Sequence, residues 1–316
     1  MNDSHYSTDG YSARCNGLIG GRAISEKTGK MVSCFKVTKE DGPFYCPRCN
    51  STAIVRKCTE KDDHFAHKPK LSPILTSKDQ SLHTECKNII CKYLSEKYPE
   101  GKWAVERPID GNPDKGTKTI IPDISGRIEK IPVAIEVQKS TYTLGKIKDK
   151  TEQYYKRGVY VLWIIPLREA LGHDDFRPRL FEKYLHAMYY GRAYYWIPTK
   201  PNKLLPVHFS YSCRYIEESS FYDENGKEQC FGGYYLPYKT IKKPNSDGFI
   251  NIATDLKKVD RPLFKNIKWE EEIPACKIMM DTKDTWWSKN EKEEMINMSN
   301  NCQYNEDEYY DSFDNY

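Results

Sequence analysis

Two acidic side chains stand at the ends of two short β-prone segments. Asp123 follows Pro122 after the segment 119–121, and Glu136 interrupts the apolar run 133–137. A carboxylate inside such a run is costly to bury unless it is paired or binds a cation. Asp and Glu oxygens suit Mg²⁺, which usually takes one or two carboxylates together with a substrate phosphate. The sequence therefore predicts a Mg²⁺ site made by Asp123 and Glu136, with a surface hairpin of ordinary acids as the alternative.

The segments that carry these acids, 119–121 and 131–137, are typical of neighbouring strands of one sheet. The dipeptide Ser125-Gly126 favours a turn between them. Gln138 lies two residues after Glu136, so the alternation of a strand puts both side chains on one face.

The order Pro122-Asp123 followed by Glu136-Val137-Gln138 resembles the PD-(D/E)xK nuclease superfamily, with Gln138 where a Lys is usual. The run 134–140 is closer still to the competence protein CoiA-like branch. The resemblance implies an α/β fold, a restriction-endonuclease-like mixed sheet flanked by helices. It also implies that Asp123, Glu136 and the Val137 carbonyl hold the metal, while Gln138 orients the attacking water or the phosphate.

A predicted helix over 81–98 precedes these strands. Asp79, His83 and Lys87 fall four residues apart and would lie along one side of it. In the CoiA-like family an acid, a His and a Lys occupy this spacing, which implies catalytic roles for these three residues, with Asp79 replacing the usual Glu. An amphipathic helix with solvated charges is the alternative.

A second charged helix is expected over 141–157, followed by a central strand over 159–165 and a helical, aromatic stretch over 173–195. The succession Lys150, Tyr154, Gly158 and Trp163 resembles the Arg, Tyr, Gly and Trp of the family. The resemblance implies that Lys150 and Tyr154 bind substrate, with the Lys150 ammonium supplying a cation for phosphate.

A separate metal site is indicated near the start of the chain. Cys46 and Cys49 form a Cys-x-x-Cys knuckle, and His64 and His67 follow after fourteen residues. Two thiolates on a tight turn and two His on a helical turn fit a structural Zn²⁺. Cys58 is an alternative to one His, and a redox pair or free thiols with surface histidines is the alternative to zinc. The knuckle followed by His-Phe-Ala-His also resembles the amino-terminal region of CoiA-like proteins.

The 316 residues divide into four predicted parts. These are an N-terminal zinc-finger-like module (1–70), a nuclease-like domain (71–200), a C-terminal extension of unknown role (201–290) and an acidic, disordered tail (291–316). The tail holds eight acids and one Lys, a net charge of −7, so the rest of the chain carries +11 of the total of +4. That basic body is compatible with a phosphate-backbone partner.

No stretch approaches the roughly 18 apolar residues of a membrane span, and no leader is evident. We therefore expect a soluble, cytoplasmic protein with no membrane partner and an undetermined oligomeric state. The eleven Cys are expected to be buried or metal-bound thiols.

The leading hypothesis is a Mg²⁺-dependent deoxyribonuclease that acts on single- or double-stranded DNA, in DNA uptake, recombination or defence against foreign DNA. A second hypothesis is a DNA-binding or processing factor that keeps the nuclease fold but cleaves weakly or not at all. The substitutions at Gln138 and Asp79 favour it. A third is a zinc-stabilised protein-interaction module in which the acids are incidental.

Overall fold

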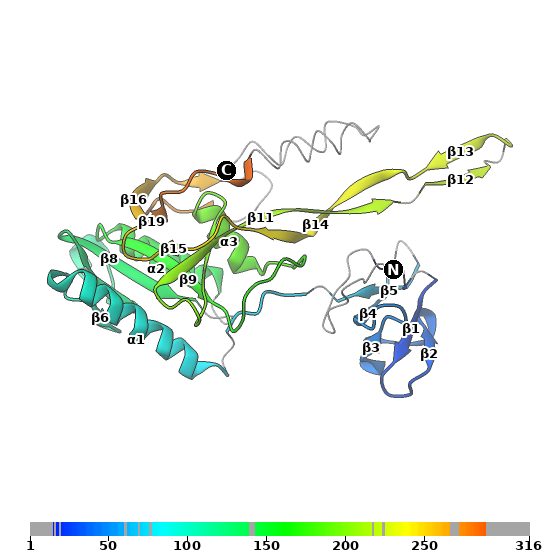
Figure 1. Cartoon of the computed structure of the whole chain (residues 1–316), viewed down its shortest axis with the longest axis horizontal. Coiled ribbons are helices and arrows are strands. Elements are labelled where there is room, and N and C mark those ends of the chain that lie inside the picture. Colours follow the sequence, from blue (N-terminus) through cyan, green and yellow to red (C-terminus); the bar gives the residue numbers. More distant parts are fainter. Residues whose placement is uncertain are drawn as a thin grey trace.

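The computed structural model describes residues 15, 17–18, 20–59, 62–68, 70–75, 78–138, 143–216, 218–222, 225–265 and 272–288. The polar arm expected at 1–12 and the acidic tail at 291–316 lie outside these residues. Figure 1 shows a small β module near the start of the chain and a larger α/β body.

The first part of the chain forms an antiparallel sheet in the order β2-β1-β3-β4-β5. Its small core is built around Phe44 and Phe65, whose rings meet edge to face at 5.1 Å. The strands are β1 (Arg22–Ser25), β2 (Met31–Ser33), β3 (Phe44–Tyr45), β4 (Thr52–Arg56) and β5 (His64–His67). We call residues 15–68 the N-terminal module.

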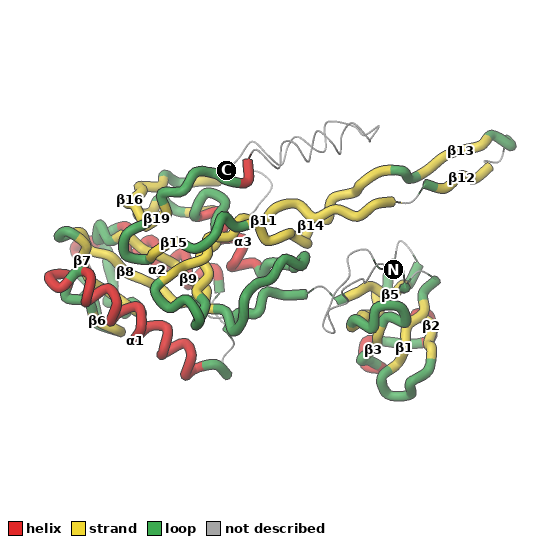
Figure 2. The backbone as a smooth tube through the Cα atoms, viewed as in Figure 1, coloured by secondary structure: helices red, strands yellow, loops and turns green. Residues whose placement is uncertain are grey.

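The larger body combines a mixed sheet with three α-helices in the described part of the chain (Figure 2). The helices are α1 (Gln80–Lys97), α2 (Leu144–Tyr155) and α3 (Leu180–Met188). The strands before residue 200 are β6 (Ala104–Val105), β7 (Ile124–Ile128), β8 (Ile131–Val137), β9 (Tyr160–Pro166) and β10 (Ala193–Trp196).

Nine further strands follow in the chain. They are β11 (Lys203–Ile216), β12 (Ser219–Tyr222), β13 (Glu228–Phe231), β14 (Tyr234–Asn245), β15 (Ile250–Asn251), β16 (Leu256–Arg261), β17 (Phe264–Lys265), β18 (Glu272–Ile273) and β19 (Cys276–Asp281). β11 and β14 form a long ribbon that projects from the body and continues into the β12–β13 hairpin (Figure 1).

The main sheet runs in the order β14-β11-β10-β9-β8-β7-β6. β8, β9 and β10 are parallel, whereas β6, β7 and β8 are joined antiparallel. β9 is almost wholly apolar and buried, as expected for a central strand with parallel neighbours. The predicted mixed α/β fold is therefore confirmed.

The hairpin that carries the two acids turns at a different place from the one predicted. Ser125 and Gly126 lie inside β7, and the turn is at Glu129-Lys130, both with positive φ (49° and 72°). Gly126 is needed for close approach, because a Cβ there would lie 2.2 Å from the Trp103 ring. The glycine of Ser125-Gly126 therefore serves the packing of Trp103 against β7 and does not form a turn.

One other expectation is corrected. The segment 173–195 is not one helix, since α3 covers only its middle and β10 begins at Ala193. The region after residue 201 contributes to the main sheet, because β19 pairs with β9 in parallel and with β16. Within the described part of the chain, no helix combines the length and the apolar character that a membrane span needs.

Candidate active site

The two acids lie at the open end of the β7–β8 hairpin. The register pairs Ile124 with Ile135, so Asp123 stands opposite Glu136 at the next position. Directly opposed residues of antiparallel strands share a face, with Cβ atoms about 5 Å apart. Asp123 is fixed further, because its Oδ2 accepts a hydrogen bond from the Val137 backbone N–H at 2.8 Å. The hairpin thus brings both carboxylates to one edge of the sheet.

Glu136 is buried and engaged by α2. The Lys150 Nζ lies 2.8 Å from both carboxylate oxygens, and the Tyr154 hydroxyl donates to Oε1. Burial raises the pKa of Glu136 to about 7; the nearby Asp123 charge adds to this rise, and Lys150 opposes it. Lys150 and Tyr154, expected to bind substrate, lie against the Glu136 carboxylate in this structure.

α1 approaches the same edge through two buried polar residues. The His83 Nε2 donates to the Val137 carbonyl at 3.0 Å. The Lys87 ammonium lies 2.5 Å from Glu106 Oε1 and 3.7 Å from Asp123 Oδ1. His83 and Lys87 thus belong to the same cluster as the acids, as their four-residue spacing predicts.

Glu106 is a member of this cluster that the sequence did not reveal. It follows β6 with a φ of +50°, and its backbone N–H donates to the Asp123 carbonyl at 3.0 Å. Its carboxylate pairs with Lys87. Glu106 could have been found from its position directly after β6, because β6 pairs with β7 and Asp123 directly precedes β7.

Asp79 lies farther from the centre of the cluster. It is the N-cap residue of α1 and is held by Arg168, whose Nε and Nη2 donate to its Oδ2 at 2.9 and 2.5 Å. Asp79 and Lys87 are eight positions apart in the sequence, which corresponds to about 12 Å along the helix axis. Asp79 and Lys87 therefore lie on the same side of α1, about two turns apart along its axis.

Gln138 directly follows β8 and is buried. Its backbone N–H donates to the Ile164 carbonyl of β9 at 2.7 Å, which continues the parallel pairing past Val137. Regular alternation keeps its side chain on the Glu136 face.

The donor set at this edge suits a hard cation. Asp123, Glu136 and the Val137 carbonyl are all oxygen ligands of the kind that Mg²⁺ prefers. Burial raises the pKa of Glu136, and the charge of the neighbouring Asp123 raises it further. A divalent cation between them would relieve their repulsion, so the residues fit a Mg²⁺ ion.

A second cluster lies in the N-terminal module and consists of Cys15, Cys46, Cys49 and His67, whose ligand atoms all lie within 4.8 Å of one another. The Cys15 and Cys46 sulfurs are 3.6 Å apart, and Cys49 Sγ lies 3.3 Å from His67 Nε2. A Zn–S bond of about 2.3 Å gives a tetrahedral edge of about 3.8 Å. Burial lowers the pKa of His67, which favours the neutral imidazole that a metal requires. This cluster could hold a metal ion such as zinc.

The cluster contains Cys15 in the place that the sequence assigned to His64. His64 and His67 are three apart on strand β5, and odd spacing on a strand points side chains to opposite faces. The helical turn expected for the two His is therefore wrong. Cys58, the other alternative ligand, lies 3.8 Å from His64 Nδ1 and outside the cluster.

Cys15 was missed because it stands far upstream of the knuckle. The nearest signal is Gly17, where a Cβ would lie 2.5 Å from both Cys46 Sγ and Arg48 Cβ. Only a glycine allows the chain after Cys15 to pass so close to the knuckle.

Comparison with known proteins gives two matches along the chain. The family model for the competence protein CoiA N-terminal domain matches residues 29–72. The model for the competence protein CoiA nuclease-like domain matches residues 79–224, which include the acid pair and both helices that contact it. No curated protein and no solved structure matches the chain. Because the two matched segments follow in order and together cover more than half of the 316 residues, the chain belongs to the competence protein CoiA-like family.

Proposed function

We propose that this protein is a Mg²⁺-dependent deoxyribonuclease with its active site at the Asp123–Glu136 edge. The observation that carries the proposal is the register of the β7–β8 hairpin, which sets the two carboxylates opposite each other. The nuclease-like family domain supports the reaction class. The +11 charge of residues 1–290 supports a phosphate-backbone partner.

Asp123, Glu136 and the Val137 carbonyl would hold the metal. When bound, Mg²⁺ would polarise the phosphoryl oxygen and lower the pKa of a bound water. The Val137 N–H orients the Asp123 carboxylate, and His83 orients the Val137 carbonyl. These two hydrogen bonds would hold the Asp123 carboxylate and the Val137 carbonyl in the orientations needed to bind the metal before substrate arrives.

Three further residues would stabilise the charge of the phosphate, orient the attacking water or keep Glu136 ionised. Lys87 lies beside Asp123 and would stabilise negative charge that develops on the phosphate. The Gln138 amide would orient the water or the phosphate, since it cannot supply the positive charge of the usual Lys. Lys150 favours the ionised form of Glu136, which a metal ligand requires.

The test is cleavage of single-stranded, duplex and branched DNA, and of RNA, in the presence of Mg²⁺. Asp123→Asn keeps an oxygen that accepts from the Val137 N–H and removes the charge, so the fold should survive. We expect at least a roughly 100-fold loss of rate, because a metal centre supplies several kcal/mol of transition-state stabilisation. Asp110→Asn, at an exposed loop position, is the matched control.

Affinity for the same DNA is measured in EDTA for all variants. A rate loss in Asp123→Asn with unchanged affinity supports hydrolysis at this site. Cleavage by Asp123→Asn at the rate of the unaltered protein contradicts the proposal.

A DNA-binding factor without cleavage is the second candidate. The contacts of Lys150 and Tyr154 with Glu136 favour it, because they already satisfy the carboxylate that the metal needs. Salt-sensitive DNA binding without cleavage in Mg²⁺ or Mn²⁺ would support this candidate.

The N-terminal module is proposed as a zinc-stabilised contact for the DNA backbone. Its candidate ligands come from strand β5, from the knuckle and from the segment before β1. A zinc ion would stabilise a segment whose own core is small.

A further inference from the structure

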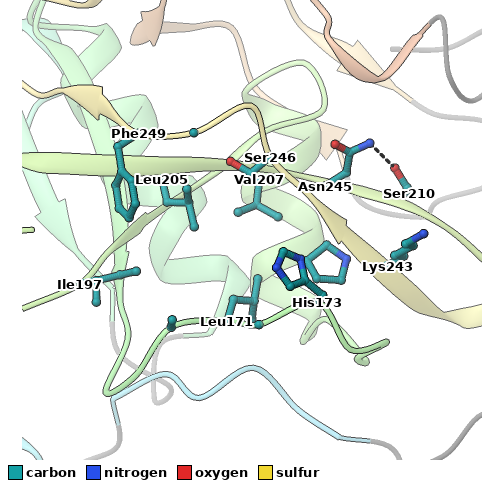
Figure 3. Close-up of a pocket in the computed structure, with 14 residues that line it drawn as sticks. Leu171, His173, Ile197, Leu205, Val207, Ser210, Lys243, Asn245, Ser246 and Phe249 are labelled. Atoms are coloured by element: carbon teal, nitrogen blue, oxygen red, sulfur yellow. Dashed lines mark hydrogen bonds between the residues drawn. The ribbon is translucent and has the colours of Figure 1, made fainter. Parts of the chain in front are cut away.

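A pocket of about 550 Å³ lies away from the acid pair and has no role in the proposed cleavage (Figure 3). Its floor is apolar and includes Leu171, Ile197 and Val207, which are all buried. The Phe249 ring stands at its rim with 36% of the residue exposed. Apolar walls with a few polar groups are typical of sites for small or planar ligands.

The polar groups of the pocket come from β11, from the end of β14 and from the segment after β9. Ser210 is only 4% exposed, and its Oγ accepts a hydrogen bond from the Asn245 Nδ2 at 3.2 Å. This bond uses one N–H of the amide, and the carboxamide of Asn is the side chain best suited to the edge of adenine. Lys243 and His173 also line the pocket (Figure 3), and both residues are exposed. The Lys243 ammonium can therefore meet a phosphate.

One end of the pocket, with Ile197 and Phe249, lies near the sheet edge that carries the acids, because Ile197 follows β10 and β15 pairs with the start of β11. Ser210 and Lys243 lie farther along β11 and β14. β8, β9 and β10 are parallel, so their carboxyl ends lie at one edge. Glu136 is near the end of β8, Leu171 and His173 follow β9, and Ile197 follows β10. Adjacent strands are about 4.8 Å apart, so β10 lies about 10 Å from β8, roughly three stacked nucleotides of about 3.4 Å each.

We propose that this pocket binds one unstacked base of the nucleic-acid strand whose backbone passes the acid pair. Phe249 stacks on the base, Asn245 pairs with its edge, and Lys243 contacts the adjoining phosphate. The position relative to the scissile phosphate rests on the proposed function, whereas the base-binding chemistry stands on the pocket itself. The protein then acts on single strands or on duplex ends that can release a base.

The probe is a fluorescein-labelled oligodeoxyadenylate, with binding measured by anisotropy in EDTA so that no cleavage is needed. Phe249→Ala should weaken binding about tenfold, the loss expected for one stacked base. Phe249→Tyr should restore it. Leu263→Ala, which alters another exposed apolar residue outside the pocket, should bind like the unaltered protein. Lys243→Ala should lower the slope of log affinity against log salt by about one.

Abasic substitution along the oligonucleotide gives the decisive comparison. One abasic position should weaken binding to the unaltered protein, and the same position should have no effect on Phe249→Ala. Equal effects on both proteins at every position would overturn the proposal.

Cleavage of the same oligonucleotides in Mg²⁺ separates the two proposals. If an abasic position weakens binding only when Phe249 is present, and no cleavage occurs, the base-binding proposal is supported and the nuclease proposal is rejected. Asp123-dependent cleavage with no such abasic effect removes the pocket and leaves the nuclease.

Discussion

At the scale of single residues, the Glu136 environment is the most informative feature. The side chain is buried and paired with Lys150, yet its pKa is raised to about 7. The cost of burial and the neighbouring Asp123 charge thus exceed the benefit of the Lys150 ammonium. A carboxylate in this state is poorly suited to a purely structural role and well suited to a cation.

The raised pKa makes stability depend on pH in a defined direction. An unfolded Glu titrates near 4.5 and the folded Glu136 near 7, so the folded state binds the proton more tightly. The stabilising contribution is therefore complete below pH 4.5 and is lost as pH rises through about 7, by roughly 3 kcal/mol. Urea unfolding in EDTA should show this fall in the free energy of unfolding, and Glu136→Gln should lack it. Parallel pH curves for the two proteins would refute the assignment.

The effect of Lys150 on the pKa of Glu136 can be tested by mutation. Lys150→Met removes the cation that lowers the pKa of Glu136, so that pKa rises further. The ascending limb of the pH–rate profile for DNA cleavage should then move to higher pH. Lys146→Met, at an exposed position of the same helix, is the control. If the ascending limb of the pH–rate profile of Lys150→Met stays at the pH of the unaltered protein, Lys150 does not lower the pKa of Glu136.

At the scale of elements, the β7–β8 hairpin sets the geometry of the site. Its register depends on how β7 packs, and Gly126 allows the Trp103 ring to lie directly on that strand. A one-residue slip would move every side chain of β7 to the other face and separate Asp123 from Glu136.

Gly126→Ala should therefore damage both stability and activity. A Cβ at that position would lie 2.2 Å from the Trp103 ring, which forces the ring or the strand to move. We expect a loss of roughly 1–3 kcal/mol, as for other overpacked sites, measured by urea unfolding. Gly145→Ala in α2 is the control, because its Cβ would meet open space and Ala favours the helix. Equal stability of the two variants would contradict this view of the hairpin.

The local elements show what the sequence could and could not predict. The helix after Asp79 and the strand 159–165 follow from their apolar patterns, and both are close to α1 and β9. The turn was misplaced because Gly126 serves packing, and Glu129-Lys130 carry no turn signal. The partners of Glu136 on α2 depend on tertiary contact, which residue spacing does not encode.

At the scale of the whole molecule, the N-terminal module illustrates the same limit. The knuckle and His67 were evident from spacing, but Cys15 lies 31 residues before Cys46 and enters the cluster only through the fold. The family resemblance of both parts was evident from motifs, and the two family matches confirm it.

The ligand set predicts which substitutions remove the metal. Cys15→Ser should lower the bound zinc, measured by elemental mass spectrometry, and should lower the melting temperature of the protein, because metal binding is coupled to folding. His64→Ala should retain the zinc, since His64 lies outside the cluster. Loss of zinc in His64→Ala with retention in Cys15→Ser would reverse the assignment.

The pairing of β19 with β9 has a consequence for how the protein is made. β9 is flanked by β8 and, at its first half, by a strand that begins only at Cys276. During synthesis the ribosome must therefore release more than 100 residues after β9 before that half of the strand gains its second neighbour. Until then an apolar edge stays open to unrelated chains, so nascent forms shorter than about 280 residues should depend on chaperones that the finished protein does not need.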